Sequence, residues 1–173
     1  FYKNKMIFLD AKPNKAHLKL AEMEQAGKLS AIVTQNIDGL HQAAGSKNVF
    51  ELHGSVHRNY CQKCGKFFDV NYVVNAKGVP YCDECGGIIK PDVVLYEEGL
   101  DSQTINGAVR AISKADMLII GGTSLVVYPA AGMIDYFKGK YLAVLNRDAT
   151  SRDKQADLCI TDPIGEVLGR IRV

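Results

Sequence analysis

The chain lacks several features that would assign it to a class directly. No apolar run approaches the roughly 20 residues that a membrane-spanning helix needs. No charged segment precedes an apolar one, as it does in a secretory signal peptide. The 21 basic and 19 acidic residues leave a net charge of only +2, which is too small to indicate nucleic acid or membrane as a partner. Internal repeats and low-complexity segments are also absent, so we expect a globular protein with no nucleic-acid and no membrane partner.

What is present fits one compact unit. A length of 173 residues suits a single domain with a small insertion, and 47% hydrophobic against 23% charged residues is enough apolar material for a core. The first residue is Phe1, so we expect that the chain begins inside a longer protein or was processed. Four of the five cysteines form C-x2-C pairs. Without a secretion signal, such pairs are more often metal ligands than disulfides, which places the protein in the cytoplasm.

Helical and strand-like segments alternate along most of the chain. The patterns predict helices over 13–26, 102–113 and 129–138, and a last helix that starts at Pro163 with Asp162 as its cap. Continuous apolar runs predict buried strands over 31–34, 117–120, 141–145 and 158–160. This alternation predicts an α/β fold with a mostly parallel sheet and helices on both faces. Residues 56–90 break the rhythm and show no convincing helix, so we interpret them as a small inserted module.

The inserted module carries a metal-site pattern. Cys61-x2-Cys64 and Cys82-x2-Cys85 are separated by 17 residues, a spacing typical of a tetrahedral thiolate zinc site. A glycine follows each cysteine pair, which indicates a tight turn at each. A turn of this kind lets two sulfurs from one loop face one ion. Four thiolates leave no open coordination position, so the predicted zinc is structural, with a catalytic zinc or redox-active cysteine pairs as the alternatives. His57 lies near in sequence, but the four cysteines already saturate the metal.

Polar residues follow the predicted buried strands, where open α/β sheets bind ligands. Asn36 and Asp38 follow the first strand, and two interpretations stay open: a turn stabilised by local hydrogen bonds, or a ligand site. Gly122-Thr123-Ser124 follows another strand and offers N–H and hydroxyl groups for a phosphate or ribose, although the G-x-G-x-x-G fingerprint is absent. Asn146 follows a third strand and is a candidate contact to ribose or adenine.

Among the four histidines, His53 is the candidate for catalysis. It lies in Glu51-Leu52-His53-Gly54-Ser55, beside the polar strand ends. A lone histidine is more often structural than catalytic, and both roles stay open on position alone. Imidazole titrates near neutral pH, which suits a general base. His17 lies on a predicted helix and His41 follows the Asp38-Gly39 turn, so we interpret both as packing or surface residues.

Taken together, these segments resemble the sirtuin family of NAD-dependent protein lysine deacylases, of bacterial type. The matching pieces follow the family's order over essentially the whole chain, and their combination is highly specific although no single motif decides. They are Ala11-Lys12-Pro13-Asn14-x-Ala16-His17, Thr34-Gln35-Asn36-Ile37-Asp38-Gly39-Leu40-His41, Glu51-Leu52-His53-Gly54-Ser55, the two C-x2-C pairs, Lys90-Pro91-Asp92-Val93-Val94, Gly122-Thr123-Ser124-Leu125-x-Val127-x-Pro129-Ala130, and Asn146. The resemblance implies a Rossmann-like NAD-binding domain over 1–55 and 91–173, with a zinc-ribbon module over 56–90.

The resemblance also implies a chemistry. In the family, the acyl-lysine oxygen attacks C1′ of the nicotinamide ribose, nicotinamide leaves, and a histidine base activates a ribose hydroxyl that attacks the resulting imidate. Free lysine and O-acyl-ADP-ribose are the other products. On this chain His53 matches the base, and Asn36 matches the residue that orders the ribose and a water. The positions that match NAD contacts are Gln35 at the ribose, Ile37 and Asp38 at the nicotinamide, Gly122, Thr123, Ser124, Asn146 and Arg147 along the ADP-ribose, and Ile160 near the adenine.

The expected partner is an acyl-lysine protein or peptide. The segment Val93 to Glu98 matches the strand that pairs with the substrate backbone, with Val93, Val94 and Tyr96 as contacts. Such main-chain pairing gives affinity with little sequence selectivity. The family often has Phe-Gly-Glu where this chain has Tyr96-Glu97-Glu98. Glu97 adds bulk and negative charge, which leaves the substrate preference open and favours basic flanking residues.

One departure from the family affects the expected activity. Sirtuins begin with a Gly-Ala-Gly-x-Ser loop and a Pro-Asp-Phe-Arg motif, and this sequence starts after them. We therefore expect the first central strand to be missing, its neighbours to have open edges, and residues 1–173 alone to bind NAD poorly and to turn over slowly or not at all. The alternatives are a catalytically silent zinc-ribbon/Rossmann binding fragment and a sirtuin-like ADP-ribosyltransferase. A zinc-ribbon nucleic-acid binder is disfavoured by the near-neutral charge.

Overall fold

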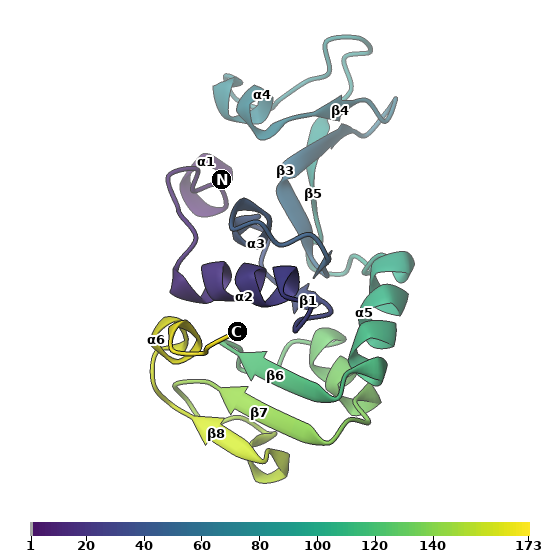
Figure 1. Ribbon diagram of the computed structural model, residues 1–173. Helices are drawn as coiled ribbons and strands as arrows, with labels where there is room; N and C mark the ends of the chain where they lie inside the picture. The colour runs from purple at the N-terminus through teal and green to yellow at the C-terminus, as the bar shows by residue number, and fades with distance from the viewer. Residues whose placement is uncertain (1) are drawn as a thin grey trace.

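The computed structural model describes residues 2–173, except for the side chains of Lys3 and Asn4. Helices and strands alternate along the chain, as Figure 1 shows. In chain order the elements are α1 (Tyr2–Lys5), α2 (Lys15–Gln25), β1 (Ile32–Thr34), α3 (Leu40–Ala43), β2 (Val49–Glu51), β3 (Gly54–Cys61), β4 (Phe67–Phe68), α4 (Val70–Asn75), β5 (Ile89–Val93), α5 (Ser102–Lys114), β6 (Met117–Gly121), the 3-10 helix η1 (Ala130–Tyr136), β7 (Tyr141–Leu145), the 3-10 helix η2 (Asp153–Gln155), β8 (Leu158–Ile160) and α6 (Ile164–Gly169).

The parallel strands form two separate sheets. The order β6-β7-β8 makes one sheet, in which Met117 pairs with Tyr141 and Ala143 with Leu158. The order β1-β2 makes the other, with Ile32 opposite Val49. Within residues 2–173, β1 pairs only with β2 and β6 pairs only with β7, so each has one edge without a strand partner. All these pairings are parallel, which confirms the predicted fold class and places the carboxyl ends of β6, β7 and β8 at one edge.

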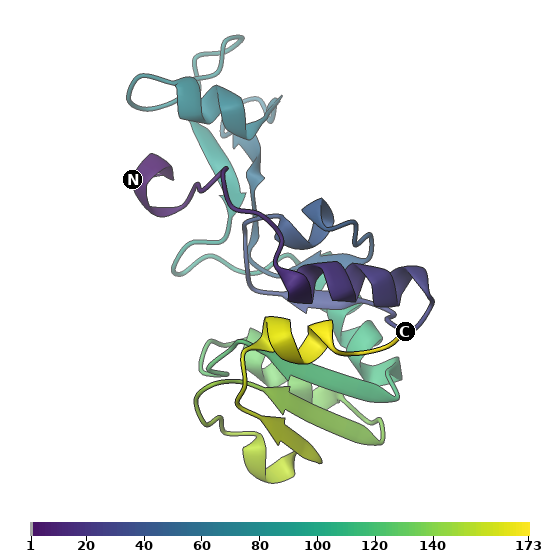
Figure 2. The ribbon, with the colours of Figure 1, turned by 60° about the vertical axis from the view of Figure 1, so that its left-hand side comes forward.

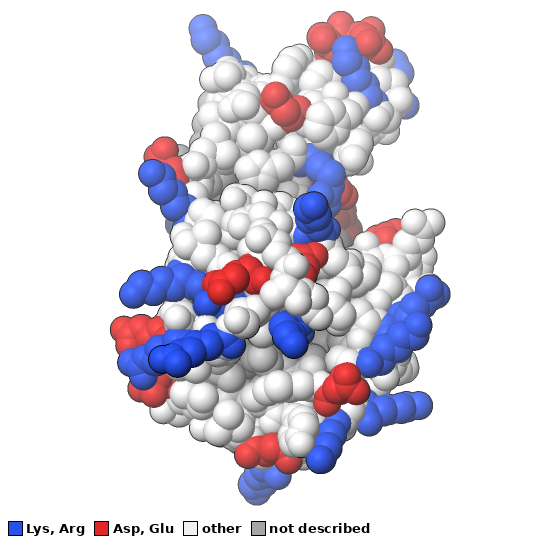
Figure 3. All heavy atoms as spheres, viewed as in Figure 1, with Lys and Arg blue, Asp and Glu red and all other residues white. Residues whose placement is uncertain are grey.

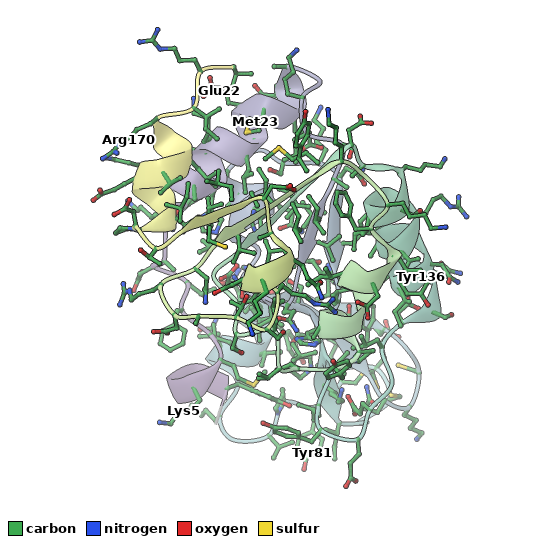
Figure 4. All side chains as sticks on the ribbon, turned by 90° about the horizontal axis from the view of Figure 1, so that it is seen from below. Lys5, Glu22, Met23, Tyr81, Tyr136 and Arg170 are labelled. Atoms are coloured by element: carbon green, nitrogen blue, oxygen red, sulfur yellow. The ribbon has the colours of Figure 1, made fainter. Side chains whose placement is uncertain are left out.

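Helices cover both faces of the β6-β7-β8 sheet, as predicted. Side chains of one parity, such as Ala143 and Leu145, pack against Ala16 of α2 and Leu168 of α6. Side chains of the other parity, such as Val144, pack on the side of η1. Alternation along a strand is what directs these two sets to opposite faces. In Figure 4, Met23 of α2 and Arg170 beside α6 lie on one side of the molecule and Tyr136 of η1 on the other.

The module with the cysteines forms an antiparallel sheet of order β4-β3-β5 at one end of the molecule (Figures 1 and 2). Its small core holds Cys61, Phe68, Val73, Cys82 and Ile89. The expectation that this region has no helix is wrong, because α4 forms over Val70–Asn75. The side chain of Asp69 accepts the N–H of Tyr72 and caps it. Both long strands, β3 and β5, continue out of the module toward the parallel sheets.

Three predicted helices differ in detail. The helix predicted from Pro13 begins at Lys15, because Asn14 is its cap and exchanges hydrogen bonds with His17 in a capping box. The helix predicted over 129–138 is a 3-10 helix, η1. Asp162 does not cap α6, which has Pro163 at its cap position and no side-chain cap bond. The sequence patterns located these elements, but the atoms at their ends depend on local geometry.

Two surface properties bear on partners. Within residues 2–173, no helix combines the length and apolar character required to cross a bilayer. On the face shown in Figure 3, basic and acidic side chains are interspersed, without an extended area of one sign.

Candidate functional site

The four paired cysteines converge on one point. Their Sγ atoms all lie within 4.8 Å of one another, with Cys61–Cys85 at 3.3 Å and Cys64–Cys82 at 3.7 Å. A tetrahedral Zn²⁺ with Zn–S bonds of about 2.3 Å would have S···S edges of about 3.8 Å. The donor set therefore fits zinc, and four thiolates leave no ligand position for a substrate. Cys159, the fifth cysteine, is an exposed free thiol away from this cluster.

Contacts among the four thiols shift their pKa values in opposite directions: the pKa of Cys61 is lowered, and those of Cys64 and Cys85 are raised. Burial opposes ionisation of Cys61, but backbone N–H groups of Cys64 and Lys63 and the neighbouring thiols lower its pKa to about 6. A thiolate is the form that binds metal. Lys66 links the two cysteine pairs, because its Nζ is 2.8 Å from carboxylate oxygens of both Asp83 and Glu84. The four sulfur donors make the site structural by its donor count.

His53 follows the end of β2 and contacts the end of β1. Its Nδ1 lies 3.1 Å from the backbone oxygen of Gln35. A carbonyl oxygen only accepts, so Nδ1 must carry the hydrogen in a neutral ring, which leaves Nε2 with its lone pair free to take a proton. The side chain of Gln35 in turn accepts a hydrogen bond from Thr123 Oγ1 at 3.4 Å. The loops that follow the two parallel sheets are therefore joined at Gln35, whose backbone oxygen contacts the imidazole and whose side chain contacts Thr123.

The loop between β1 and α3 holds Gln35 and three further predicted residues. Asp38 behaves as the turn interpretation requires, since its Oδ1 accepts the N–H of Leu40 at the start of α3. The backbone N–H of Asn36 donates to Thr34 Oγ1. Ile37 packs against the cluster of Ile7, Val56, Val70 and Val93, and its oxygen accepts the N–H of Val56. This loop is therefore fixed at both ends while the side chain of Asn36 stays exposed.

The predicted NAD contacts on the second sheet lie at its carboxyl edge. Gly122 follows β6 and donates its N–H to Leu145, the last residue of β7. Asn146 follows β7, donates its N–H to Ile160 at the end of β8, and bonds through Nδ2 to the oxygen of Asp148. The side chains of Ser124 and Arg147 are exposed beside them. Parallel pairing thus gathers these residues at the sheet edge where open α/β folds bind ligands.

The predicted substrate segment departs from a continuous strand. Only Val93 belongs to β5, where it is buried opposite Gly54, and Val94 donates its N–H to the oxygen of His53 at 3.1 Å. A turn follows, closed by a Glu98 carboxylate that accepts the N–H of Leu95. Tyr96 is fully exposed on this turn, and Glu97 has a positive φ of 71°. The segment therefore joins the His53 loop directly and then turns away from the sheet.

Sequence reasoning missed a charged group beside this junction. Arg58, on β3, donates to Glu51 at 2.7 Å and to Asp92 at 2.8 Å. Burial by itself would lower the pKa of Arg58, but these two carboxylates raise it above its ordinary value. No motif marks the three residues, because they are brought together by an irregularity in β3. His57, also on β3, was considered as a metal ligand but bonds through Nε2 to the oxygen of Asp38 at 2.9 Å.

Cavity size alone would point elsewhere. A shallow cavity of about 530 Å³ lies at the opposite, amino ends of β7 and β8, lined by Asp135, Lys140, Arg152 and other residues. None of the predicted site residues lines it. We give greater weight to the carboxyl edge, because convergent polar groups and the parallel topology both lie there.

Known proteins match this arrangement. The model of the Sir2 family matches residues 1–129. The NAD-dependent protein deacetylase of Clostridium acetobutylicum is 67% identical over 169 residues, covering 97% of this chain and 69% of that protein. A solved complex described as Sir2 with p53 peptide and NAD⁺ has a TM-score of 0.87 at 41% identity, covering 94% of this chain and 70% of that one. A Sir2 complex with the inhibitor EX-527, 2′-O-acetyl-ADP-ribose and deacetylated p53 peptide has a TM-score of 0.87 at 42% identity, covering 94% and 71%.

Proposed function

This chain belongs to the Sir2 family, and from that premise we propose that it is an NAD-dependent protein lysine deacetylase with His53 as its base. The observation that carries the assignment to His53 is the hydrogen bond from its Nδ1 to the oxygen of Gln35. That bond leaves Nε2 as a proton acceptor, and the side chain of the same Gln35 accepts a hydrogen bond from Thr123, which follows β6 of the second sheet. Relatives with this name and Sir2 complexes with NAD⁺ and acetylated or deacetylated peptide support the activity.

We infer that NAD lies across the carboxyl edge of the strands. The residues that would hold it are Gln35, Ile37 and Asp38 beside His53, and Gly122, Thr123, Ser124, Asn146, Arg147 and Ile160 on the second sheet. When bound, NAD supplies the C1′ carbon that takes the acyl oxygen as nicotinamide leaves. Backbone N–H and hydroxyl groups after β6 suit phosphate and ribose oxygens. The exposed Asn36 amide, on a loop fixed at both ends, suits the ordering of a ribose hydroxyl and a water.

The role of His53 is to remove a proton from that ribose hydroxyl at Nε2. Nδ1–H stays bound to the oxygen of Gln35, so the ring orientation is set before any ligand binds. A neutral imidazole held in one tautomer is suited to general-base catalysis near neutral pH. The side chain of Gln35 adds the contact to Thr123, which links the base to the predicted phosphate and ribose contacts.

The acyl-lysine substrate is placed along Val93, Val94 and Tyr96. The N–H of Val94 bonds to the oxygen of His53, so a peptide beside this segment would bring its acyl group near the imidazole. Pairing through the main chain accounts for recognition of lysine in varied sequences. Zinc supports this arrangement from a distance, because β3 and β5 run from the cysteine cluster to the site. We place the enzyme in the cytoplasm, in keeping with five free thiols of which four form the metal cluster.

The test is direct detection of the product. The protein is incubated with an acetyl-lysine peptide and NAD at millimolar concentration, since the sequence predicts weak NAD binding by residues 1–173, and O-acetyl-ADP-ribose is sought by mass spectrometry. We expect product that disappears in His53→Ala while zinc content is unchanged. His17→Gln is the matched control, because glutamine also serves at the third position of a capping box. Deacetylation that persists in His53→Ala would refute the assignment of the base, and no product from the zinc-loaded wild type would refute deacetylation by residues 1–173.

A further inference from the structure

A bulge in β3 carries a side chain that reaches both predicted site segments. Ser55 pairs with Asp92 and Asn59 pairs with Pro91, so residues 56–58 have no partners on β5. A bulge bends its strand and re-aims the side chains within it, and bulges are frequent beside active sites. Here the bulge directs Arg58 toward the end of β2, and the N–H of Val56 in the same bulge holds the oxygen of Ile37.

Arg58 contacts two carboxylates from different strands at once. Its Nη1 donates to Glu51 Oε2 at 2.7 Å, and its Nε donates to Asp92 Oδ2 at 2.8 Å. The Glu51 side chain is only 9% exposed, so its charge needs a partner. A planar guanidinium offers several N–H donors in a fixed arrangement, whereas a lysine ammonium is a point charge without that geometry. The bridge therefore depends on arginine specifically.

The two carboxylates belong to residues that precede the predicted base and the predicted substrate segment in the sequence. Glu51 is the last residue of β2, two positions before His53. Asp92 immediately precedes Val93 on β5, and the next residue, Val94, bonds to the oxygen of His53. Moving either carboxylate therefore moves either the imidazole or the segment assigned to the peptide.

We propose that Arg58 is a positioning residue of this site, which fixes the strand end that leads to His53 against the strand that leads to Val93 and Val94. The proposal rests on the proposed deacetylase function for its kinetic consequence. Without the guanidinium, Glu51 and Asp92 lose their shared counter-charge and repel each other. The imidazole of His53 and the segment assigned to the peptide are then no longer held in a fixed position relative to each other. Displacements of about 1 Å at reacting groups can lower the rate on the order of 100-fold.

The test compares Arg58→Gln and Arg58→Lys with a matched arginine elsewhere. Arg152 also bridges two partners, Asp135 at 2.6 Å and Gln155 at 3.0 Å, but it lies away from the site. At saturating NAD and well below the unfolding temperature of each variant, we expect Arg58→Gln to lower kcat/KM for an acetyl-lysine peptide by about 10–100-fold. We expect the kcat/KM of Arg58→Lys to lie between those of wild type and Arg58→Gln. The kcat/KM of Arg152→Gln should stay within about twofold of the wild-type value. Asp92→Asn should raise KM for the peptide more than it lowers kcat.

A second measurement does not require turnover. The imidazole resonances of His53 are followed by NMR, and we expect them to shift in Arg58→Gln and not in Arg152→Gln. If wild type makes no product, the proposed function fails, but a selective shift of His53 still supports the positioning role. Unchanged kcat/KM and unchanged His53 resonances in both Arg58 variants would overturn the proposal. Equal kinetic losses in Arg58→Gln and Arg152→Gln would also overturn it, because they would indicate a general effect on stability.

Discussion

Replacing Gly54 by alanine should damage both stability and activity, because this glycine stands where β3 starts beside His53. Its φ is +75°, a region that residues with a Cβ rarely adopt. A Cβ at this position would lie 1.9 Å from the backbone oxygen of Asp92 and 2.8 Å from its carbonyl carbon. Both atoms belong to the strand backbone of β5, which cannot rotate away as a flexible side chain can.

The expected loss has two parts. A left-handed conformation costs an L-residue about 1–2 kcal/mol. The clash requires β3 and β5 to separate by about 1 Å before the Cβ reaches the 3.0 Å that real Cβ contacts respect. That movement weakens the hydrogen bond from Val94 to His53 and its neighbours, at about 1 kcal/mol each. Together these contributions lower the free energy of unfolding by about 3 kcal/mol, which corresponds to roughly 6–12 °C for a chain of this length.

The measurement is urea and thermal unfolding of the zinc-loaded protein, with Gly78→Ala as control. Gly78 also has a positive φ, of 85°, but a Cβ there would meet nothing within 4 Å. It therefore reports the backbone strain alone, about 1–2 kcal/mol. A Gly54→Ala loss no larger than that of Gly78→Ala would refute the steric argument. Retention of full deacetylation by Gly54→Ala would refute the claim that this junction positions His53.

Four further outcomes are expected. Metal analysis should find one Zn²⁺ per chain. Cys64→Ser or chelation should lower the unfolding temperature, because loss of the metal releases Cys61 and Cys82, which belong to the module core. A zinc-free protein of unchanged stability would contradict this. Burial lowers the pKa of His17 below its ordinary 6.5, although the nearby Asp38 acts in the opposite direction. The pKa of His41 is also lowered, first by burial and then by the neighbouring His17. The unfolded chain then binds more protons, so the contribution of these histidines to the free energy of unfolding should be fully present above pH 6.5 and should be lost as the pH falls below it. In His41→Gln, the free energy of unfolding measured in denaturant titrations should depend less on pH. Glu97→Gly should raise stability by about 1 kcal/mol by relieving the positive φ, as chemical denaturation can check; a loss would contradict it. Calorimetry should find NAD binding by residues 1–173 weaker than micromolar, and micromolar affinity would contradict the expectation from the sequence.

Much of the fold could be predicted because its signals are local. The strand over 141–145 was predicted with its observed bounds, since a continuous apolar run between Lys140 and Asn146 leaves little alternative. The zinc cluster followed from spacing, because two C-x2-C turns impose their own geometry on four sulfurs. Helix ends were less accurate. The helix α2 begins at Lys15, after its cap Asn14, rather than at Pro13, and η1 has 3-10 geometry, because end positions depend on individual capping atoms and on packing.

The candidate site shows the same division. The sequence by itself determined which residue types follow each strand, and alternation of helices and strands determined that Thr123 and Asn146 share one edge. Only the tertiary structure decided that His53 binds the oxygen of Gln35 and so presents Nε2. It also decided that the Asp38 carboxylate accepts the N–H of Leu40 in a turn and that Arg58 joins Glu51 to Asp92. These contacts connect residues on different elements, and they depend on the bulge in β3 and on the close approach of Gly54 to the backbone of β5. No local sequence pattern encodes the distance between two strands that meet only after folding.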